Sequence, residues 1–312
     1  MKTSIRIILF FLVLLLPLSS FAQYVRGDVN RNRTVDIADL SAMINTLLTS
    51  GGKYMPICDV NYDRVSNITD VTALINFLLT GTWSSPELEG PQIPDNAQVF
   101  TVNGVSFAMI TVEGGTFDYV THLTHPTVEE KTVGDFMIGM TEVTQELWLA
   151  VMGENPSFCV WDLRQPVENI TYYDCERFMA ELNLLTGMDF CFPTEEQWEF
   201  AARGGNLSHG YKWAGSDDPD MVAWYLYDKN AYYPYPVGMK MPNELGLYDM
   251  SGNVLEWVYN AGSGDIDANT MLLGGSTHLE SVYCTVDMFY SCWPNVAPPA
   301  GGLRLALPAT AK

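Results

Sequence analysis

Two short stretches near the N-terminus carry oxygen-bearing side chains at the same spacing, and that spacing suits a calcium ion. In each stretch Asp or Asn occupies positions 1, 3, 5, 9 and 12 of a loop. Calcium prefers about six to eight oxygen ligands at about 2.3–2.6 Å, and alternate loop positions can wrap around it. The predicted ligands are Asp28, Asn30, Asn32, Asp36 and Asp39 in the first loop, and Asp59, Asn61, Asp63, Asn67 and Asp70 in the second.

The two loops belong to a repeat, and each is followed by a predicted helix. Asp28 and Asp59 lie 31 residues apart, and so do Ile44 and Ile75. After each loop, apolar residues recur with the i, i+3, i+4, i+7 spacing of one helix face. These residues are Leu40, Met43, Ile44 and Leu47 in the first helix, and Val71, Leu74, Ile75 and Leu78 in the second. Each repeat therefore needs the other to bury its apolar face.

The twin repeat, from Gly27 to about Thr82, resembles a type I dockerin, a module that docks exported proteins onto a cohesin. The resemblance implies that the helix starts face this partner, at Ile37, Ala38, Ile68 and Thr69. Arg33 and Arg64 depart from the pattern, because glycine is expected at loop position 6. The alternative interpretation is a helical hairpin that has lost its metal.

The start of the chain is typical of an export signal. Lys2 and Arg6 give a positive beginning, the apolar run 7–16 follows, and Ser20-Phe21-Ala22 is a small-x-small cleavage site. We therefore expect a secreted or cell-surface protein that begins near residue 23. No later stretch contains the roughly 18 apolar residues of a membrane span, so none is expected.

Composition and length bound the remaining possibilities. A net charge of −21 argues against nucleic acid and anionic membranes as partners, because the surface repels both. Six cysteines in an exported chain permit disulfides, and we expect at most two, with the remaining cysteines as buried thiols. None shows the Cys-x-x-Cys spacing of a metal site. The predicted organisation is a signal peptide over 1–22, the repeats over 23–82, a proline-rich linker over 83–97 and one large domain over 98–312.

N-cap residues predict three helices in the large domain. Thr144 is the predicted N-cap of a helix over 145–152. Thr171 with Asp174, and Thr194 with Gln197, have the spacing of capping boxes. The acidic pair that follows Thr194, Glu195 and Glu196, resembles a catalytic pair, but acids in a first turn are what the helix dipole favours. We interpret them as structural.

A series of motifs in the large domain is similar to the formylglycine-generating-enzyme, or sulfatase-modifying-factor, family. The motifs, in chain order, are 109–117 (MITVEGGTF), 138–145 (IGMTEVTQ), 193–205 (PTEEQWEFAARGG), 243–257 (NELGLYDMSGNVLEW), Gly274-Gly275-Ser276 and Gly302-Leu303-Arg304. The resemblance implies a C-type-lectin-like fold with much irregular backbone. With the repeats, it predicts an α+β protein.

The same resemblance implies a structural calcium site around the strongest motif. It would use the side chains of Asp249 and Glu256 and the backbone carbonyls of Gly252 and Val254. Two carboxylates and two carbonyls within eight residues form a set of ligands suited to a hard cation. The alternative is that Asp249 and Glu256 only cap turns.

Catalysis in this family depends on copper held by two cysteines spaced five apart, a few residues after Gly-Gly-Ser. Here the matching positions are Leu279 and Cys284, so one thiolate ligand is missing, and a two-coordinate Cu(I) site needs both. Copper is therefore not expected; if the chain were an enzyme, Cys284 and Ser276 would be its catalytic residues. His122 and His125 form a lone His-x-x-His pair without a visible third ligand.

Residues 277–302 differ in composition from the family pattern, which is rich in Asn and Arg here. The segment lacks Lys, Arg and Gln, and all but Glu280, Met288 and Trp293 can be encoded by codons that end in a pyrimidine. This bias resembles that of target proteins of diversity-generating retroelements, which vary a lectin-like fold near its C-terminus. We predict a ligand-binding face for a protein or glycan, formed by His278, Tyr283, Phe289, Tyr290, Trp293 and Asn295. An ordinary divergent segment is the alternative.

Together these observations predict a docked, non-catalytic ligand-binding protein that uses calcium. Two alternatives remain open from the sequence. One is a copper-dependent formylglycine-generating oxidase that acts on sulfatase cysteines, and the other is a spacer in a polysaccharide-degrading assembly.

Overall fold

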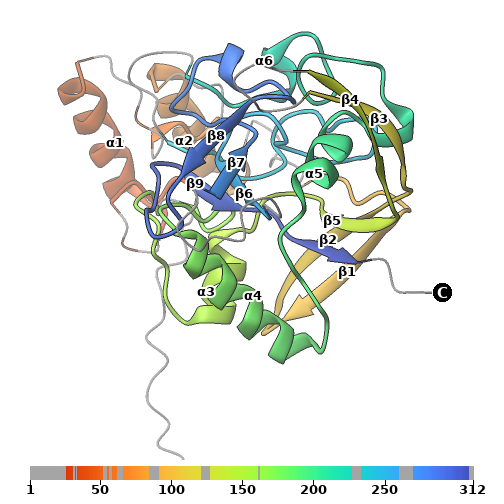
Figure 1. The fold of residues 1–312 in the computed structure, drawn as a ribbon. Coiled ribbons are helices and arrows are strands. Elements are labelled where there is room, and N and C mark those ends of the chain that lie inside the picture. The colour runs from red at the N-terminus through yellow and green to blue at the C-terminus, as the bar shows by residue number, and fades with distance from the viewer. Residues whose placement is uncertain are drawn as a thin grey trace, which may run out of the picture.

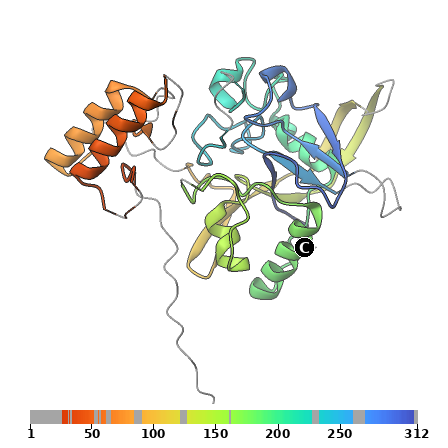
Figure 2. The same cartoon turned by 90° about the vertical axis from the view of Figure 1, so that its left-hand side faces the viewer.

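In the computed structural model, a pair of helices at the N-terminal end precedes a larger domain of mixed helices and strands (Figures 1 and 2). The structure describes residues 26–30, 32, 34–51, 55, 58–61, 66–83, 91–120, 127–160, 162–226, 233–259 and 270–308. The predicted export signal and its cleavage site, the pair His122 and His125, and the first part of the linker lie outside these residues. The mixed architecture confirms the predicted α+β class.

The N-terminal module is built from helices α1 (Ile37–Thr49) and α2 (Ile68–Thr80). Each begins with a capping box, at Asp36 with Asp39 and at Asn67 with Asp70. The two repeats therefore have the same N-terminal cap as well as the same spacing. Met43, Val71 and Leu74 are buried between the helices, as the apolar spacing predicted. For Ile44 and Ile75 the prediction was wrong, because their side chains are 40% and 37% exposed. Leu40, Leu47 and Leu78 pack against them from the edge.

The first and last residues of the N-terminal module pack against each other. The ring of Trp83 stacks on Phe77 with centroids 4.3 Å apart, and the guanidinium of Arg26 lies 4.3 Å from the Trp83 ring centroid. Gly27 has a positive φ of 89°, and a Cβ there would lie 2.8 Å from the Trp83 ring. Only glycine therefore allows the first loop to approach this close to the end of the module.

In the described part of the large domain, strands form three sheets. The first has the order β1-β2-β5-β10, the second pairs β3 with β4, and the third has the order β8-β7-β6-β9. All pairings are antiparallel except β6 with β9. The bounds are β1 (Ala97–Val102), β2 (Val105–Val112), β3 (Gly115–Val120), β4 (Val128–Val133), β5 (Phe136–Gly139), β6 (Leu255–Val258), β7 (Thr270–Leu273), β8 (Phe289–Cys292), β9 (Gly301–Leu303) and β10 (Ala306–Pro308).

The three predicted helices of the large domain form where their caps placed them. They are α3 (Gln145–Met152), α4 (Tyr172–Thr186) and α5 (Glu195–Ala202). The hydroxyls of Thr144, Thr171 and Thr194 each accept the N–H three residues on. Short helices complete the fold: η2 (Gly205–Leu207), α6 (Pro219–Val222) and η3 (Ser281–Tyr283).

The core of the large domain is organised around two tryptophans that also make polar contacts. Trp257 is fully buried and donates from Nε1 to the carbonyl of Ile170 at 3.1 Å. Trp198 is equally buried and donates from Nε1 to Oε2 of Glu256 at 2.5 Å. Trp257 joins β6 to the residues just before α4, and Trp198 joins α5 to β6, so these side chains tie both regions to the third sheet.

Part of the linker lies against the large domain. The N–H of Gln92 donates to the hydroxyl of Tyr248 at 3.1 Å, and a Cβ at Gly238 would lie 2.7 Å from the ring of Pro91. Strand β1 begins at Ala97, the last residue of the predicted linker. Residues 91–96 are therefore held by the domain that follows them.

Candidate functional site

The first predicted calcium loop is wound around the aspartates at its two ends. Asp28 and Asp39 are buried, and Oδ1 of Asp28 accepts the N–H of Asn32 at 2.9 Å. Oδ1 of Asp39 accepts the N–H of Asn30 at 2.9 Å, and its Oδ2 accepts the N–H of Asp36 at 2.9 Å. These bonds tie loop position 12 to positions 3 and 9, so the ligand-bearing chain curls around one point.

The second loop repeats these contacts where it is described. Asp59 and Asp70 are buried. Oδ1 of Asp70 accepts the N–H of Asn61 at 3.2 Å, and its Oδ2 accepts the N–H of Asn67 at 2.9 Å. The predicted ligand Asp63 and the arginines at loop position 6 lie outside the described residues. The two loops therefore share both their residue types and the hydrogen bonds made by the aspartate at position 12.

The loops fit a hard cation. Each buries two aspartates close to amide side chains, and burying carboxylates is costly unless a positive charge or hydrogen bonds compensate them. In the part of the chain that the structure describes, no group of three or more His, Cys, Asp or Glu side chains is placed to hold a metal. Asparagine and backbone oxygens would therefore have to supply the remaining ligands. The ten ligands named from the sequence stay a prediction.

The predicted partner-binding residues lie in the open at the starts of both helices. Ile37 is 69% exposed and Ile68 is 70% exposed, and Ala38 and Thr69 beside them are also exposed. The exposed apolar surface continues along each helix through Ile44 and Leu48, and through the repeat-equivalent Ile75 and Leu79. We call these six isoleucines and leucines the apolar stripe. Repeat symmetry gives each helix the same three members.

The calcium site implied around Asp249 has one residue that fits a cation and one that is already occupied. Oδ1 of Asp249 is buried without a hydrogen-bond partner, while its Oδ2 accepts the N–H of Gly238 at 2.7 Å. Both oxygens of Glu256 instead accept from Arg304, which is fully buried, at 2.7–3.0 Å. This guanidinium already pairs with Glu256 and competes with any metal ion for its two oxygens. The calcium ion predicted at Asp249, Gly252, Val254 and Glu256 stays a prediction.

A third buried carboxylate, Glu142, lies in the same region. It accepts from the side-chain amide of Asn253 at 3.2 Å. Burial, together with the charge of Asp249, raises the pKa of Glu142 well above its ordinary value. Burial also raises the pKa of Asp249 to about 6. The region thus holds three carboxylates and the single guanidinium of Arg304.

The remaining cysteine of the family pair is inaccessible. Cys284 is fully buried beside Trp213 and Val222, and its Sγ lies 3.8 Å from the carbonyl oxygens of Ser276 and Glu280. Burial raises the pKa of the Cys284 thiol to about 12. Leu279, at the other cysteine position, packs against the core. The pair therefore consists of a protonated thiol and an aliphatic side chain. All six cysteines of the chain are free thiols.

The predicted ligand-binding residues of the C-terminal segment are divided between core and surface. Tyr283 is 46% exposed and Trp293 is 54% exposed, and Asn295 is exposed near them in the sequence. Phe289 and Tyr290 lie half-buried on β8, the edge strand of the third sheet. His278 is half-buried and lines a cavity.

That cavity, which we call the C-terminal cavity, has a volume of about 360 Å³, within the range of small-ligand pockets. It is lined by Phe158, Cys159, Glu168, Asn169, Tyr233, Pro234, His278, Ala297, Pro299 and Ala300. Sequence reasoning identified only His278 among these. The others come from four short stretches, 158–159, 168–169, 233–234 and 297–300, that the fold brings together, and only the last lies in the segment that the sequence marked.

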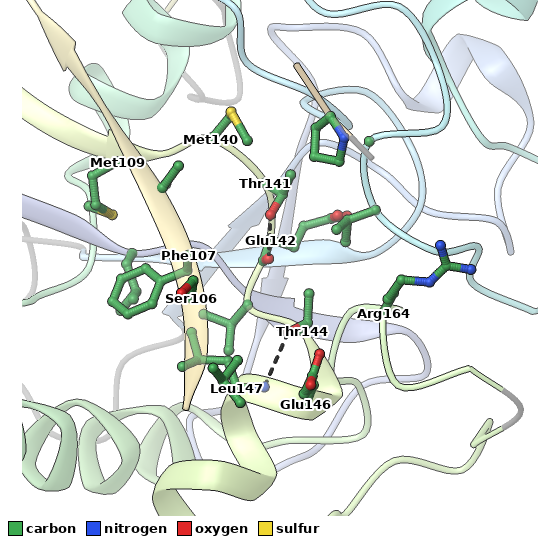
Figure 3. Close-up of a pocket in the computed structure, with 18 of the residues that line it drawn as sticks. Ser106, Phe107, Met109, Met140, Thr141, Glu142, Thr144, Glu146, Leu147 and Arg164 are labelled. Carbon is green, nitrogen blue, oxygen red and sulfur yellow. Dashed lines mark hydrogen bonds between the residues drawn. The ribbon is translucent and has the colours of Figure 1, made fainter. Parts of the chain in front are cut away.

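A second cavity, of about 280 Å³, lies away from the C-terminal segment (Figure 3). Its apolar wall includes Phe107 and Met109 of β2 and Leu147 of α3, and Figure 3 shows Thr141 and Thr144 on the connection between β5 and α3. Linker residues Pro91 and Ile93 also line it. No lining residue comes from 277–302, so this cavity belongs to the junction of linker and domain.

Twin calcium-type loops, each followed by a helix, and then a domain of small sheets and irregular backbone define a dockerin joined to a C-type-lectin-like domain. Comparison with known families agrees with this class. The dockerin type I domain matches residues 26–85. The family described as FGE-sulfatase, a sulfatase-modifying factor enzyme 1-like domain, matches residues 97–309. This match spans more than half of the chain, so the chain belongs to the sulfatase-modifying-factor family. Both family resemblances are confirmed.

The large domain is similar to individual proteins of known sequence or structure. A chaperone protein LppX of Paenibacillus barcinonensis is 34% identical, over 50% of this chain and 72% of its own length. An inactive Cα-formylglycine-generating enzyme 2 of Bos taurus is 36% identical, but the match covers only 33% of this chain and 36% of that protein. The solved structure of Treponema denticola variable protein 1 is 26% identical with a TM-score of 0.60, covering 69% of this chain and 100% of that one.

Dockerin type I domains in general bind calcium and cohesins. A dockerin also indicates an extracellular or cell-surface assembly. No helix in the described ranges is long and apolar enough to cross a membrane.

Proposed function

We propose that the chain is an exported modular protein that docks through its dockerin and presents a non-catalytic, ligand-binding domain. The observation that carries the proposal is the state of the cysteine pair. Leu279 cannot bind copper, and Cys284 is a buried thiol whose pKa is raised to about 12. Since thiolates are the ligands that Cu(I) requires, the domain keeps the family scaffold without a copper site.

The docking half of the proposal is supported by the apolar stripe. Its six side chains lie on the helices that follow the calcium loops, and patches of this kind mark protein–protein contacts. We propose that a cohesin covers Ile37, Ala38, Ile68 and Thr69, and that calcium holds the helix starts in place. Export is supported by the dockerin and by the signal-like residues 1–22. N-terminal sequencing of secreted protein should begin near residue 23.

The ligand-binding half is supported by the C-terminal segment. Exposed Tyr283 and Trp293 offer large contact areas at a low cost in side-chain entropy, and the C-terminal cavity adds a concave site. A structural relative is named a variable protein, which fits the codon bias of residues 277–302. We propose that this face is sequence-diversified. A nearby adenine-rich near-repeat of its coding sequence is expected, and a genome without one would refute diversification.

The decisive experiment is a glycan and peptide array probed with the full chain in calcium. We expect a ligand whose signal falls in Trp293→Ala and Tyr283→Ala. The matched control is Leu207→Ala, an exposed apolar side chain on η2, outside the segment. Binding that ignores all three changes would contradict the proposed face. Capture of a cohesin with no array signal at any concentration would favour the spacer in a polysaccharide-degrading assembly.

An oxidase remains the second candidate, because Cys284 and Ser276 are present at the family's positions. It predicts stoichiometric copper binding by the purified protein and oxygen consumption with a cysteine-containing sulfatase peptide. Neither is expected if the non-catalytic proposal holds, and either one would overturn it.

A further inference from the structure

The C-terminal cavity has a buried acidic group on its wall. Glu168 is only 4% exposed, yet it lines the cavity. Its Oε1 accepts the N–H of Cys159 at 2.8 Å, and its own N–H donates to the hydroxyl of Ser157 at 3.2 Å. Burial raises the pKa of Glu168, while backbone N–H groups of Cys159 and Phe158 and the nearby His278 lower it. Burial is the largest of these causes, so the pKa of Glu168 lies above its ordinary value, and the two N–H groups and His278 only partly offset the cost of burying the charge.

The other polar groups on the wall are mostly acceptors or are already used. The Nδ2 of Asn169 donates to the carbonyl of Pro156 at 3.1 Å, which leaves its Oδ1 as an acceptor. The carbonyls of Cys159 and Pro234 accept from the buried glutamines Gln145 and Gln165. Among the described residues that line the cavity, none is a lysine or an arginine. A ligand with hydrogen-bond donors therefore meets acceptors at Glu168 and Asn169, beside Tyr233 and His278, which can donate or accept.

Aromatic side chains supply the remaining chemistry. Phe158 is 83% exposed at the cavity, and Tyr233 and His278 also line it. Aromatic faces attract cations, and a carboxylate nearby adds a charge-assisted hydrogen bond. An exposed phenylalanine beside a buried carboxylate suits a ligand with an apolar stem and a positive end.

We propose that the C-terminal cavity binds a primary ammonium group at the end of an unbranched apolar chain, as in a lysine side chain, with Glu168 as its anchor. This inference rests on the proposed ligand-binding function and names the chemistry of that site. Glu168 and Phe158 lie outside the segment 277–302, whereas Ala297, Pro299 and His278 lie inside it. The anchor is thus constant, and the segment selects what carries the ammonium.

The test is saturation-transfer NMR and calorimetry on the full chain in calcium. The probes are Nα-acetyl-lysine N-methylamide, n-pentylamine and the uncharged Nα-acetyl-norleucine N-methylamide. Both amines should bind and the norleucine derivative should not. Tighter binding of the capped lysine identifies a peptide source, and tighter binding of pentylamine identifies a free amine. Equal binding of norleucine would overturn the proposal.

Glu168→Gln keeps an oxygen acceptor for the N–H of Cys159 but removes the charge. Since hydrogen bonds to charged groups are worth about 1.5–3 kcal/mol, amine affinity should fall by about 10- to 100-fold while the melting temperature stays unchanged. Glu146→Gln, an exposed carboxylate at the other cavity, is the matched control. A folded Glu168→Gln protein that binds amines like the wild type would refute the inference.

A failed ammonium site is distinguishable from a failed binding function. If an array ligand loses its signal in Trp293→Ala but not in Glu168→Gln, and the amines do not bind, the ligand-binding face stands and the ammonium inference falls. If neither the array nor the amines give a signal, the proposed function itself fails.

Discussion

The reactivity of Cys284 provides the sharpest test of the non-catalytic interpretation. A catalytic or copper-binding cysteine must be reached by solvent and must lose its proton, because the thiolate is the reactive form. Cys284 is fully buried, and burial raises the pKa of its thiol from 9.0 to about 12. The test compares the rate at which iodoacetamide alkylates Cys284 at pH 8 in the folded chain and in guanidinium chloride.

The magnitude follows from the pKa. With the pKa raised from 9.0 to about 12, the thiolate fraction of Cys284 at pH 8 is about 1000-fold lower than in the unfolded chain, where the pKa is ordinary. Burial of Sγ adds a steric barrier. Alkylation of Cys284, measured by mass spectrometry of peptides, should therefore be at least about 1000-fold slower in the native state than in guanidinium chloride.

Cys292 is the internal control because it lies half-buried on the edge strand β8. It should be alkylated before Cys284 in the folded chain, and both should react at similar rates after unfolding. Native alkylation of Cys284 within about tenfold of its unfolded rate would show an accessible thiolate. That result would contradict the non-catalytic proposal and favour the oxidase.

Three further predictions concern stability and docking. Burial raises the pKa of Glu199 to about 7, although the charge of Arg203 opposes this, so the contribution of Glu199 to the stability of the folded chain is greatest below pH 4.5 and is lost as the pH rises through 7. Glu199→Gln should therefore stabilise the chain at pH 8.5 by up to about 3 kcal/mol in urea unfolding and leave its stability unchanged at pH 4. A variant that is less stable than the wild type at pH 8.5 would contradict this prediction. Asp39→Ala and Asp70→Ala should each remove one calcium equivalent in calorimetry of the full chain, and calcium at 100 times Kd should stabilise each loop by about 2.7 kcal/mol; an unchanged stoichiometry in either variant would exclude that loop. Because the stripe is duplicated, Ile37→Asp or Ile68→Asp alone should weaken cohesin capture only slightly, while the double variant should abolish it in a calcium-dependent pull-down; full loss from one change would show that a single helix docks.

Local elements were predictable because their causes are local. Thr144, Thr171 and Thr194 cap the helices that their spacing announced, since an N-cap needs only an oxygen and the N–H two or three residues on. The dockerin helices followed from the apolar spacing for the same reason. Each of these features depends on fewer than about fifteen consecutive residues.

The sites that combine distant segments were not predictable in the same way. Glu168 and His278 lie 110 positions apart, and only the tertiary fold brings both to one cavity. Arg304 reaches Glu256 across 48 positions, and nothing in the sequence around Glu256 shows that its two oxygens are taken. The family resemblance therefore implied calcium ligands there, while the structure adds a competing guanidinium from the connection between β9 and β10.

The contacts of Arg304 also bear on the proposed diversification of residues 277–302. Its Nη1 donates to the carbonyl of Gly139 at 2.9 Å, its Nη2 donates to that of Tyr248 at 2.8 Å, and its ion pair with Glu256 reaches Trp198. These contacts join β5, the stretch before β6, β6 itself and α5, and none of them uses residues 277–302. Breaking a buried pair of this kind costs about 3–5 kcal/mol, so the network fixes the backbone strongly. Exposed residues of the segment lie outside that network, and their side chains can therefore vary for binding without loss of the fold.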